Sequence, residues 1–247
     1  MRGKFDPMEK INLFCLPFAG GSKYSYRLYE EHLPSFLNII PLEYPGRGTR
    51  MGEPLKEDVN QLVNDLYLQI ADKLDRSAYA IYGHSMGGLM SYLLTRKILE
   101  KRRTPPLHLF ITGTSGPGAL SRTEKKRHLL DKRSFIEEIR NLNGSPDEIL
   151  QNDELLDFIE PILRADFKVS ENYAHSSISP LNIPITVITG TREEMKPEDI
   201  QLWQQETLVP VDFRRMPGHH FFIFKYPYEI VGIIAKKLLV HHKSYQL

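Results

Sequence analysis

The sequence lacks the features that suit a protein to oxidising surroundings, to a membrane or to nucleic acid. It has a single cysteine, Cys15, which excludes an internal disulfide and favours a reducing compartment. No run of about 18 apolar residues occurs, and the opening MRGKFDPMEK has no apolar signal-peptide core. Lys and Arg total 32 against 31 Asp and Glu, which leaves no charge excess for nucleic acid or an anionic membrane. We therefore expect a cytoplasmic protein with no nucleic-acid or membrane partner.

Metal-binding patterns are missing as well. The nine histidines form no H-E-x-x-H motif and have no C-x-x-C partner, so the sequence supports no metal site. The 247 residues, of which 41% are hydrophobic and 26% charged, have an ordinary globular composition and are enough to bury a core. We expect a single domain over residues 1–247 that acts as a monomer.

Short apolar segments rich in β-formers alternate with longer helical patterns. One such pattern, from about Asp58 to Leu74, repeats apolar residues at a spacing that places them on one helix face. Strands that alternate with helices indicate parallel pairing in a sheet covered on both sides, which is an α/β fold. The expected strands lie at residues 11–17, 37–44, 78–83, 107–113, 183–190 and 211–218.

Residues 117–180 depart from this alternation. They carry only helical patterns, among them RSFIEEIRNL and LLDFIEPILRADF, and they lie between two expected strands. An insertion at that point lies above the carboxyl edge of the sheet, where open α/β sheets bind ligands. We therefore expect a helical lid at about residues 117–180.

The stretch YAIYGHSMGGLMSYLL contains the strongest chemical signal. An apolar strand leads into Gly83-His84-Ser85-Met86-Gly87, and helical spacing follows at once. This matches G-x-S-x-G, the nucleophile elbow, in the strand-turn-helix context that the motif requires. The alternative is a glycine-rich turn with an incidental serine. A serine at such a turn is nucleophilic only if a base takes its proton and donors hold the oxyanion.

Residues for the other roles occur in the order Ser, acid, His that is typical of this architecture. The late loop MPGHHFFIF offers His219 and His220, only one of which can face Ser85. The turn VITGTREEM offers Glu193 and Glu194 as the acid. Two further carboxylates compete, one at a helix start and one in a segment better suited to lid packing, namely Asp199 and Asp166. Since Glu194 would point away if Glu193 points in, we expect Glu193 to be the acid.

The first strand ends in LPFAGGS, where small residues let backbone N–H groups approach a reacting carbonyl. The amide after the nucleophile, from Met86, supplies a second donor, although a plain glycine turn is the alternative interpretation of LPFAGGS. We expect His84 to be wedged beneath the elbow and Cys15 to be an inert buried thiol.

The chain contains, in this order, the five segments CLPFAGG, YPGRGTR, GHSMGG, LRADF followed by ENY, and PGHHFFI. Their order and spacing resemble those of the type II thioesterases that accompany nonribosomal peptide and polyketide synthetases. The sequence resembles this family of α/β-hydrolases with a helical lid from about residue 11 to 240. The resemblance implies hydrolysis of misprimed or stalled acyl groups from the phosphopantetheine arm of acyl or peptidyl carrier domains, which would be its partners. Medium-chain acyl thioesterases that act with fatty acid synthases share these motifs.

By position in these motifs, Ser85 looks like the nucleophile and His220 like the base. The amides of Phe18 or Ala19, with that of Met86, look like the oxyanion hole. The sequence departs from the family in having Glu193 where Asp is usual, and in having His219 where Gly, Asp or Asn usually precedes the base. The implied reaction passes through an acyl-Ser85 ester and needs no cofactor, since the substrate carries its own phosphopantetheine.

Two other functions stay open at this point. One is hydrolysis of acyl-CoA or small esters, and the other is a non-catalytic binding protein on a hydrolase fold. The basic stretches, KRR at 101–103 and EKKRHLLDKR at 124–133, are either solvated helix ends or a docking face for an acidic partner. The docking hypothesis rests on five residues near the expected lid, Lys125, Lys126, Arg127, Lys132 and Arg133.

Overall fold

Six parallel strands form one sheet in the computed structural model, which describes residues 10–142, 152–176 and 178–244. The strand order is β2-β1-β3-β4-β5-β6, and every neighbouring pair is parallel. The predicted α/β class with a mostly parallel sheet is therefore confirmed. The strands are β1 (Ile11–Leu16), β2 (Leu37–Pro41), β3 (Tyr79–His84), β4 (Leu109–Thr112), β5 (Ile185–Gly190) and β6 (Asp212–Met216).

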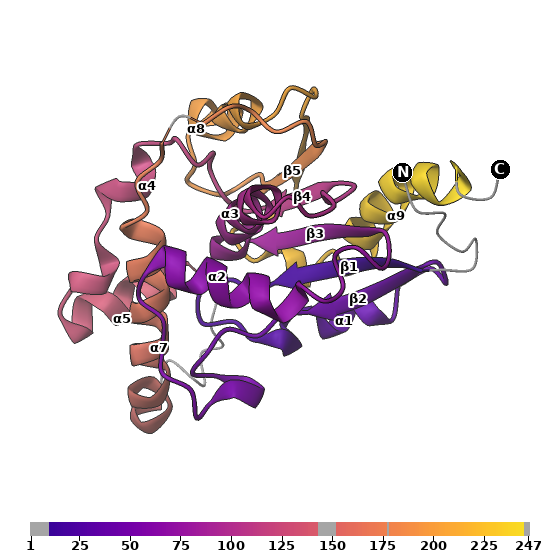
Figure 1. Cartoon of the computed structure of the whole chain (residues 1–247). Coiled ribbons are helices and arrows are strands. Elements are labelled where there is room, and N and C mark those ends of the chain that lie inside the picture. The colour runs from indigo at the N-terminus through magenta and orange to yellow at the C-terminus, as the bar shows by residue number, and fades with distance from the viewer. Residues whose placement is uncertain (1–9, 143–151, 177, 245–247) are drawn as a thin grey trace.

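Helices cover both faces of the sheet (Figure 1). The main α-helices are α1 (Arg27–Glu30), α2 (Val59–Ile70), α3 (Met86–Glu100), α8 (Pro197–Gln201) and α9 (Pro227–Ser244). Short 3₁₀ turns accompany them at η1 (Lys23–Tyr26), η2 (Gly48–Arg50), η4 (Leu202–Glu206) and η5 (Phe222–Phe224). The helix expected at Asp58–Leu74 is capped by the Asp58 side chain and ends at Ile70, after which tighter turns continue to Leu74.

The strand sequences are mostly apolar because both faces of the sheet are buried. Successive residues of β3 enter different cores, since side chains alternate across a strand. Tyr79 and Ile81 join the core beneath α2 and α3, whereas Ala80 and Tyr82 join the core beneath α1 and α9. Cys15 belongs to the second core, so the prediction that it is buried is confirmed, and this burial raises the pKa of its thiol.

A helical insertion lies between β4 and β5. It contains α4 (Ser121–Glu124), η3 (Arg127–Leu129), α5 (Lys132–Asn141) and α7 (Asp153–Glu171). In Figure 1 these helices stand at the end of the sheet toward which the strand arrows point. They have a small core of their own around Phe135 and Leu163, while Val169 joins the main core. Within the expected range 117–180, residues 143–151 and 177 lie outside the described residues.

No helix in the described ranges of the chain has both the length and the apolar character needed to cross a membrane.

His108 is a buried polar residue that precedes β4. Its Nε2 lies 2.8 Å from the Thr186 hydroxyl, and its ring stacks on Phe110 with 4.3 Å between centroids. Burial is the main cause that lowers the pKa of His108 to about 3. The folded protein therefore keeps this imidazole neutral at pH values where the unfolded chain protonates it.

We expect His108→Gln to make folding less sensitive to acid. Between the ordinary pKa of 6.5 and the folded value of about 3, the unfolded chain binds one more proton at this residue, so stability falls as pH falls. Gln keeps a partner for Thr186 but does not titrate. The slope of the unfolding free energy between about pH 6 and pH 4 should fall by ~1.4 kcal/mol per pH unit. Urea unfolding across this range measures the slope, and equal slopes in both proteins would contradict the expectation.

Candidate active site

Ser85 occupies a strained turn between β3 and α3. Its φ of 56° and ψ of −118° are unusual for a residue with a side chain, a conformation that costs about 1–3 kcal/mol and persists only when its surroundings enforce it. Here the Ser85 amide donates to the Thr112 carbonyl of β4 at 2.8 Å. A Cβ on Gly83 would lie 2.1 Å from the Gly87 carbonyl oxygen, and one on Gly87 would lie 2.2 Å from that of Leu16. Both glycines of the motif are therefore required by packing.

His84 lies beneath this turn and is fully buried, as predicted. Its Nδ1 is 3.0 Å from the Thr112 hydroxyl, and its ring centroid is 4.8 Å from that of His220. Burial first, and the neighbouring His220 second, hold the pKa of His84 well below its usual value. His84 is thus neutral at physiological pH, so it places no second positive charge beside His220.

The two neighbouring histidines lie differently. His220 is partly buried, and its Nδ1 lies 2.6 Å from Oε1 of Glu193. His219 is exposed, and its side chain makes no hydrogen bond, ion pair or ring contact among the described residues. Since Nδ1 of His220 is bound to a carboxylate, its Nε2 is the nitrogen left to exchange a proton with a substrate or nucleophile.

Of the four carboxylates considered as the acid, the structure brings Glu193 to His220. The Glu193 side chain is 3% exposed, and its Oε2 accepts from the Gly190 amide at 2.5 Å. Glu194 points into solvent. Asp199 is in the first turn of α8 and accepts from Ser121 at 2.5 Å, while Asp166 binds Arg47.

The candidate oxyanion donors come from two elements that meet at the elbow. Met86 is the first residue of α3, and Phe18 and Ala19 lie in the loop after β1. Across the described residues, the amides of these three donate to no protein acceptor. The Phe18 ring packs 5.9 Å from that of His84, which places this loop against the turn.

The sequence reasoning missed a buried ion pair beside this loop. Arg47 binds Asp166 through two hydrogen bonds, at 2.5 and 2.8 Å, and the Gly20 amide donates to the same carboxylate at 2.7 Å. Burial alone would lower the pKa of Arg47, but the facing carboxylate outweighs it and raises that pKa. Both residues stood in recognised segments, YPGRGTR and LRADF, yet no local pattern indicated that they would pair.

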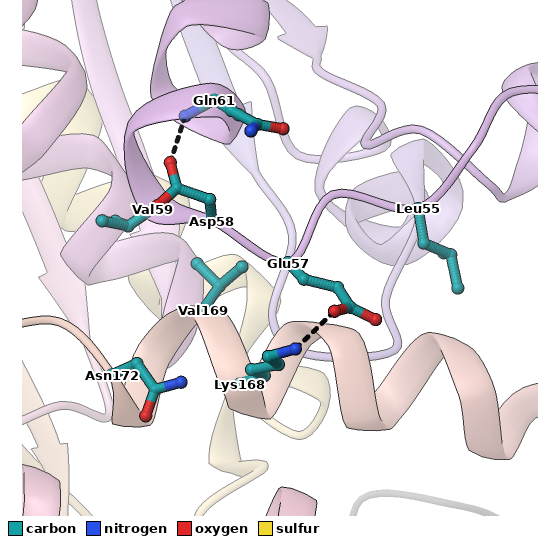
Figure 2. Close-up of a pocket in the computed structure, with 8 residues that line it drawn as sticks. All are labelled: Leu55, Glu57, Asp58, Val59, Gln61, Lys168, Val169 and Asn172. Atoms are coloured by element: carbon teal, nitrogen blue, oxygen red, sulfur yellow. Dashed lines mark hydrogen bonds and ion pairs between the residues drawn. The ribbon is translucent and has the colours of Figure 1, made fainter.

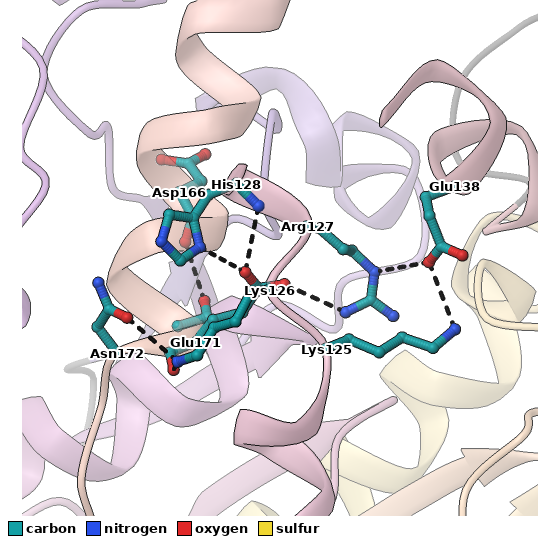
Figure 3. Close-up of polar contacts among 9 residues, drawn as sticks. Lys125, Lys126, Arg127, His128, Glu138, Asp166, Glu171 and Asn172 are labelled. Carbon is teal, nitrogen blue, oxygen red and sulfur yellow. Dashed lines mark hydrogen bonds and ion pairs between the residues drawn. The ribbon is translucent and has the colours of Figure 1, made fainter. Parts of the chain in front are cut away.

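The five basic residues considered for docking have acceptors within the insertion itself, and Figure 3 shows those of Lys125, Lys126 and Arg127. Arg127 binds Glu138 at 3.1 Å and Glu171 at 3.3 Å. Lys126 donates to the carbonyl of Glu171, and three further basic residues pair with single carboxylates. These last pairs are Lys125–Glu138, Lys132–Asp157 and Arg133–Glu137. The stretch is therefore not an unopposed cationic face, although Lys125, Lys132 and Arg133 stay more than half exposed.

A cavity of about 490 Å³ opens between the start of α2 and α7 (Figure 2). An ion pair bounds it on one side, with Lys168 Nζ 2.5 Å from Glu57 Oε2. None of the residues predicted to act in the site lines it, so the cavity does not itself mark the chemistry. Its lining is Leu55, Glu57, Asp58, Val59, Gln61, Lys168, Val169 and Asn172.

Among the residues that the structure describes, no group of three or more His, Cys, Asp and Glu side chains is placed to hold a metal ion. The arrangement around Ser85 instead combines a strained serine, an imidazole bound to a buried carboxylate, and free amides at a helix start. These are the elements of nucleophilic acyl transfer.

Comparison with known proteins points the same way. Residues 11–238 match the family model described as thioesterase domain. Thioesterase PikA5 of Streptomyces venezuelae is 33% identical over 236 residues, which cover 95% of this chain and 83% of PikA5. The crystal structure of ClbQ from the colibactin NRPS/PKS pathway has a TM-score of 0.88 at 31% identity, covering 96% of this chain and 99% of ClbQ. The type II thioesterase BorB, from the borrelidin biosynthetic cluster, has a TM-score of 0.84 at 29% identity and 93% coverage of both chains.

Replacing the two histidines one at a time should have unequal effects. We expect His220→Ala to lower turnover of a thioester by about a thousandfold or more, because it removes the imidazole that contacts Glu193. His219→Ala, the matched control, should stay within about threefold of wild type, because that ring is exposed. Steady-state kinetics on one acyl substrate compares them, and the reverse order would transfer the base to His219.

The neighbouring glutamates allow a second matched pair. Glu193→Gln keeps the shape but removes the charge that stabilises an imidazolium, so kcat should fall about a hundredfold or more. Glu194→Gln removes an exposed carboxylate and should leave kcat within about twofold of wild type. A Glu193→Gln variant that turns over like wild type would exclude Glu193 as the acid, and Asp199→Asn and Asp166→Asn would then be compared with it.

Proposed function

This chain belongs to the thioesterase family, and from that premise we propose that it hydrolyses misprimed or stalled acyl groups from the phosphopantetheine arm of carrier domains in nonribosomal peptide or polyketide synthesis. The observation that carries the proposal is the 2.6 Å contact between His220 and Glu193 beside the strained Ser85. Family membership over residues 11–238 supports the thioester as the bond cleaved.

In the proposed first half-reaction, Ser85 Oγ attacks the thioester carbonyl while Nε2 of His220 takes its proton. The carbonyl oxygen becomes an oxyanion, and the amides of Met86 and of Phe18 or Ala19 donate to it. The intermediate collapses as the C–S bond breaks. The imidazolium returns its proton to the leaving sulfur, which frees the phosphopantetheine thiol and leaves an ester on Ser85.

In the second half-reaction, water takes the place of the thiol. His220 removes a proton from this water as its oxygen bonds to the acyl carbonyl, and the same amides hold the second oxyanion. Collapse breaks the bond to Ser85 Oγ, which recovers its proton from His220 as the free acid leaves. Glu193 keeps His220 in the required tautomer and stabilises its charged form, a task that needs a carboxylate within reach rather than an Asp in particular.

In this proposal the helical insertion is a lid over the site. The chain is a single domain over residues 1–247, and it works as a monomer in the cytoplasm. The position of α7 against the loop after β1 supports the lid role, because Asp166 and Leu163 both contact Gly20. A lid at this place would exclude bulk water and shape the acyl pocket.

Acyl and peptidyl carrier domains are the proposed partners. Such domains tend to be acidic, so the exposed Lys125, Lys132 and Arg133 of the insertion are suited to meet them. Each of these side chains has a carboxylate neighbour within this chain, which weakens the local positive potential. We therefore expect docking to depend on salt less steeply than it would on an unopposed basic face.

The test offers one acyl group on a carrier domain, on CoA and on nitrophenol. We expect kcat/KM to be about tenfold or more higher for the carrier-bound thioester than for acyl-CoA, and to fall with added salt only for the carrier substrate. Ser85→Ala should abolish turnover of all three and leave folding unchanged. Equal constants for carrier and CoA substrates would favour a small-substrate hydrolase, and no turnover of any substrate would favour a binding protein.

A further inference from the structure

We propose that Asp166 and Arg47 form a positioning pair that fixes the loop of residues 17–21 to the insertion helix α7, and thereby aims the amides that hold the oxyanion. The inference rests on the proposed function, because it assigns these residues a part in the same acyl transfer. Under this inference the helical insertion is a structural part of the active site as well as a lid over it.

Three hydrogen bonds hold the loop from outside. At its start, the Tyr44 hydroxyl donates to the Pro17 carbonyl at 2.8 Å. At its end, the Gly20 amide donates to Asp166 at 2.7 Å, and Arg47 donates to the Gly21 carbonyl at 3.4 Å. The amides of Phe18 and Ala19 lie between these fixed points in the chain. Within the loop, the Gly21 amide donates to the Phe18 carbonyl at 2.9 Å, which fixes the peptide that carries the Ala19 amide, and the outside groups position this turn as a whole.

The same face of α7 also presses on the loop through an apolar contact. Leu163 and Asp166 are three residues apart and thus lie on one helix face. Gly20 has a φ of +76°, and a Cβ there would lie 2.5 Å from Leu163 Cδ2. The positive φ favours glycine here, and a side chain at this position would also require Leu163 to move. The carboxylate and the leucine of α7 thus set the position of the same peptide.

Breaking the ion pair between Arg47 and Asp166 would be energetically costly, because both side chains are buried. The side chains of Arg47 and Asp166 are 6% and 2% exposed. Such a pair is maintained only when its geometry is good and its remaining donors and acceptors are satisfied. Asp166 meets this condition by accepting two bonds from Arg47 and one from Gly20. Arg47 meets it only in part, because its guanidinium lies over the Tyr44 ring, 5.2 Å from the centroid, while its Nε is buried without a hydrogen-bond partner among the described residues. Removing the charge of Asp166 leaves a buried cation next to the loop.

A positioning role predicts a particular kinetic signature. An oxyanion forms only in the transition state, so misaimed donors lower kcat while substrate affinity changes little. Loss of one oxyanion donor typically costs about 10²–10³ in kcat, and displacement of the donors should cost less. A role in stability alone would instead lower the melting temperature and the amount of folded enzyme, with kcat per folded molecule unchanged.

Glu171 supplies a matched control on the same helix. It is 3% exposed and buried like Asp166, and it pairs with His128 at 2.7 Å and with Arg127 at 3.3 Å (Figure 3). These partners belong to η3 of the insertion, and no hydrogen bond or ion pair links Glu171 to residues 17–21 in the described chain. Glu171→Gln therefore disturbs a buried ion pair of α7 without touching the loop.

The experiment compares Asp166→Asn, Arg47→Lys and Glu171→Gln with wild type on a nitrophenyl ester and on a carrier-bound thioester of the same acyl group. We expect Asp166→Asn to lower kcat about 10- to 100-fold on both substrates with KM within about threefold. Arg47→Lys keeps the charge but not the two-point geometry, and should give a smaller loss of the same kind. Glu171→Gln should keep kcat within about threefold, even where its melting temperature falls as far as that of Asp166→Asn.

A second measurement tests the oxyanion directly. An alkyl boronic acid forms a tetrahedral adduct on a nucleophilic serine, so its affinity should fall in step with kcat in Asp166→Asn and stay unchanged in Glu171→Gln. The inference is overturned if Asp166→Asn changes only KM, if boronate affinity does not follow kcat, or if both variants lose kcat in proportion to stability. Wild-type protein that hydrolyses the ester but not the carrier thioester would reject the proposed function alone. Wild-type protein that hydrolyses neither would reject both.

Discussion

The site depends on the absence of side-chain atoms at two glycines. At Gly83 and Gly87 the backbones of β1, β3 and α3 approach so closely that a Cβ would lie 2.1–2.2 Å from a carbonyl oxygen. This contact forces Ser85 into its strained turn. It also brings the start of α3 against the end of β1, so the Met86 amide and the loop from Phe18 meet at one place. The position of the serine and that of the candidate oxyanion donors therefore have a single steric cause.

The electrostatics around this turn follow from burial. The His84 ring, at the end of β3, has its centroid 4.8 Å from that of His220, and burial holds the pKa of His84 well below its usual value, so His84 adds no positive charge beside Ser85. The charged groups that are buried nearby occur with partners: Glu193 with His220, and Asp166 with Arg47. Each carboxylate also accepts a backbone amide, from Gly190 and Gly20 respectively. Buried carboxylates satisfied in this way hold the loops that they touch in fixed positions.

The insertion contributes contacts in two directions. Toward the sheet, α7 touches the loop after β1 and lines the cavity beside α2 (Figure 2). Within itself, it links its helices through ion pairs that engage the basic residues of the 124–133 stretch. The basic stretch is therefore first a set of internal links, and only its outer side chains are available to a partner. Helix α7 takes part in the contacts in both directions, so its placement affects both the lid and the loop after β1.

Local patterns in the sequence determined the sheet, the elbow and the order of the candidate groups. Apolar runs mark the strands and Gly83 and Gly87 mark the turn because strand burial and turn sterics act over a few residues. Tertiary structure alone decided which groups meet. It brought the expected Glu193 to the expected His220, rather than any of the other three carboxylates, and it paired Arg47 with Asp166 across 119 positions of sequence. These contacts join loops at the carboxyl edge of the sheet. The distances between the contacting groups follow from how the strands and helices pack, and the spacing of residues in a short stretch of sequence does not predict that packing.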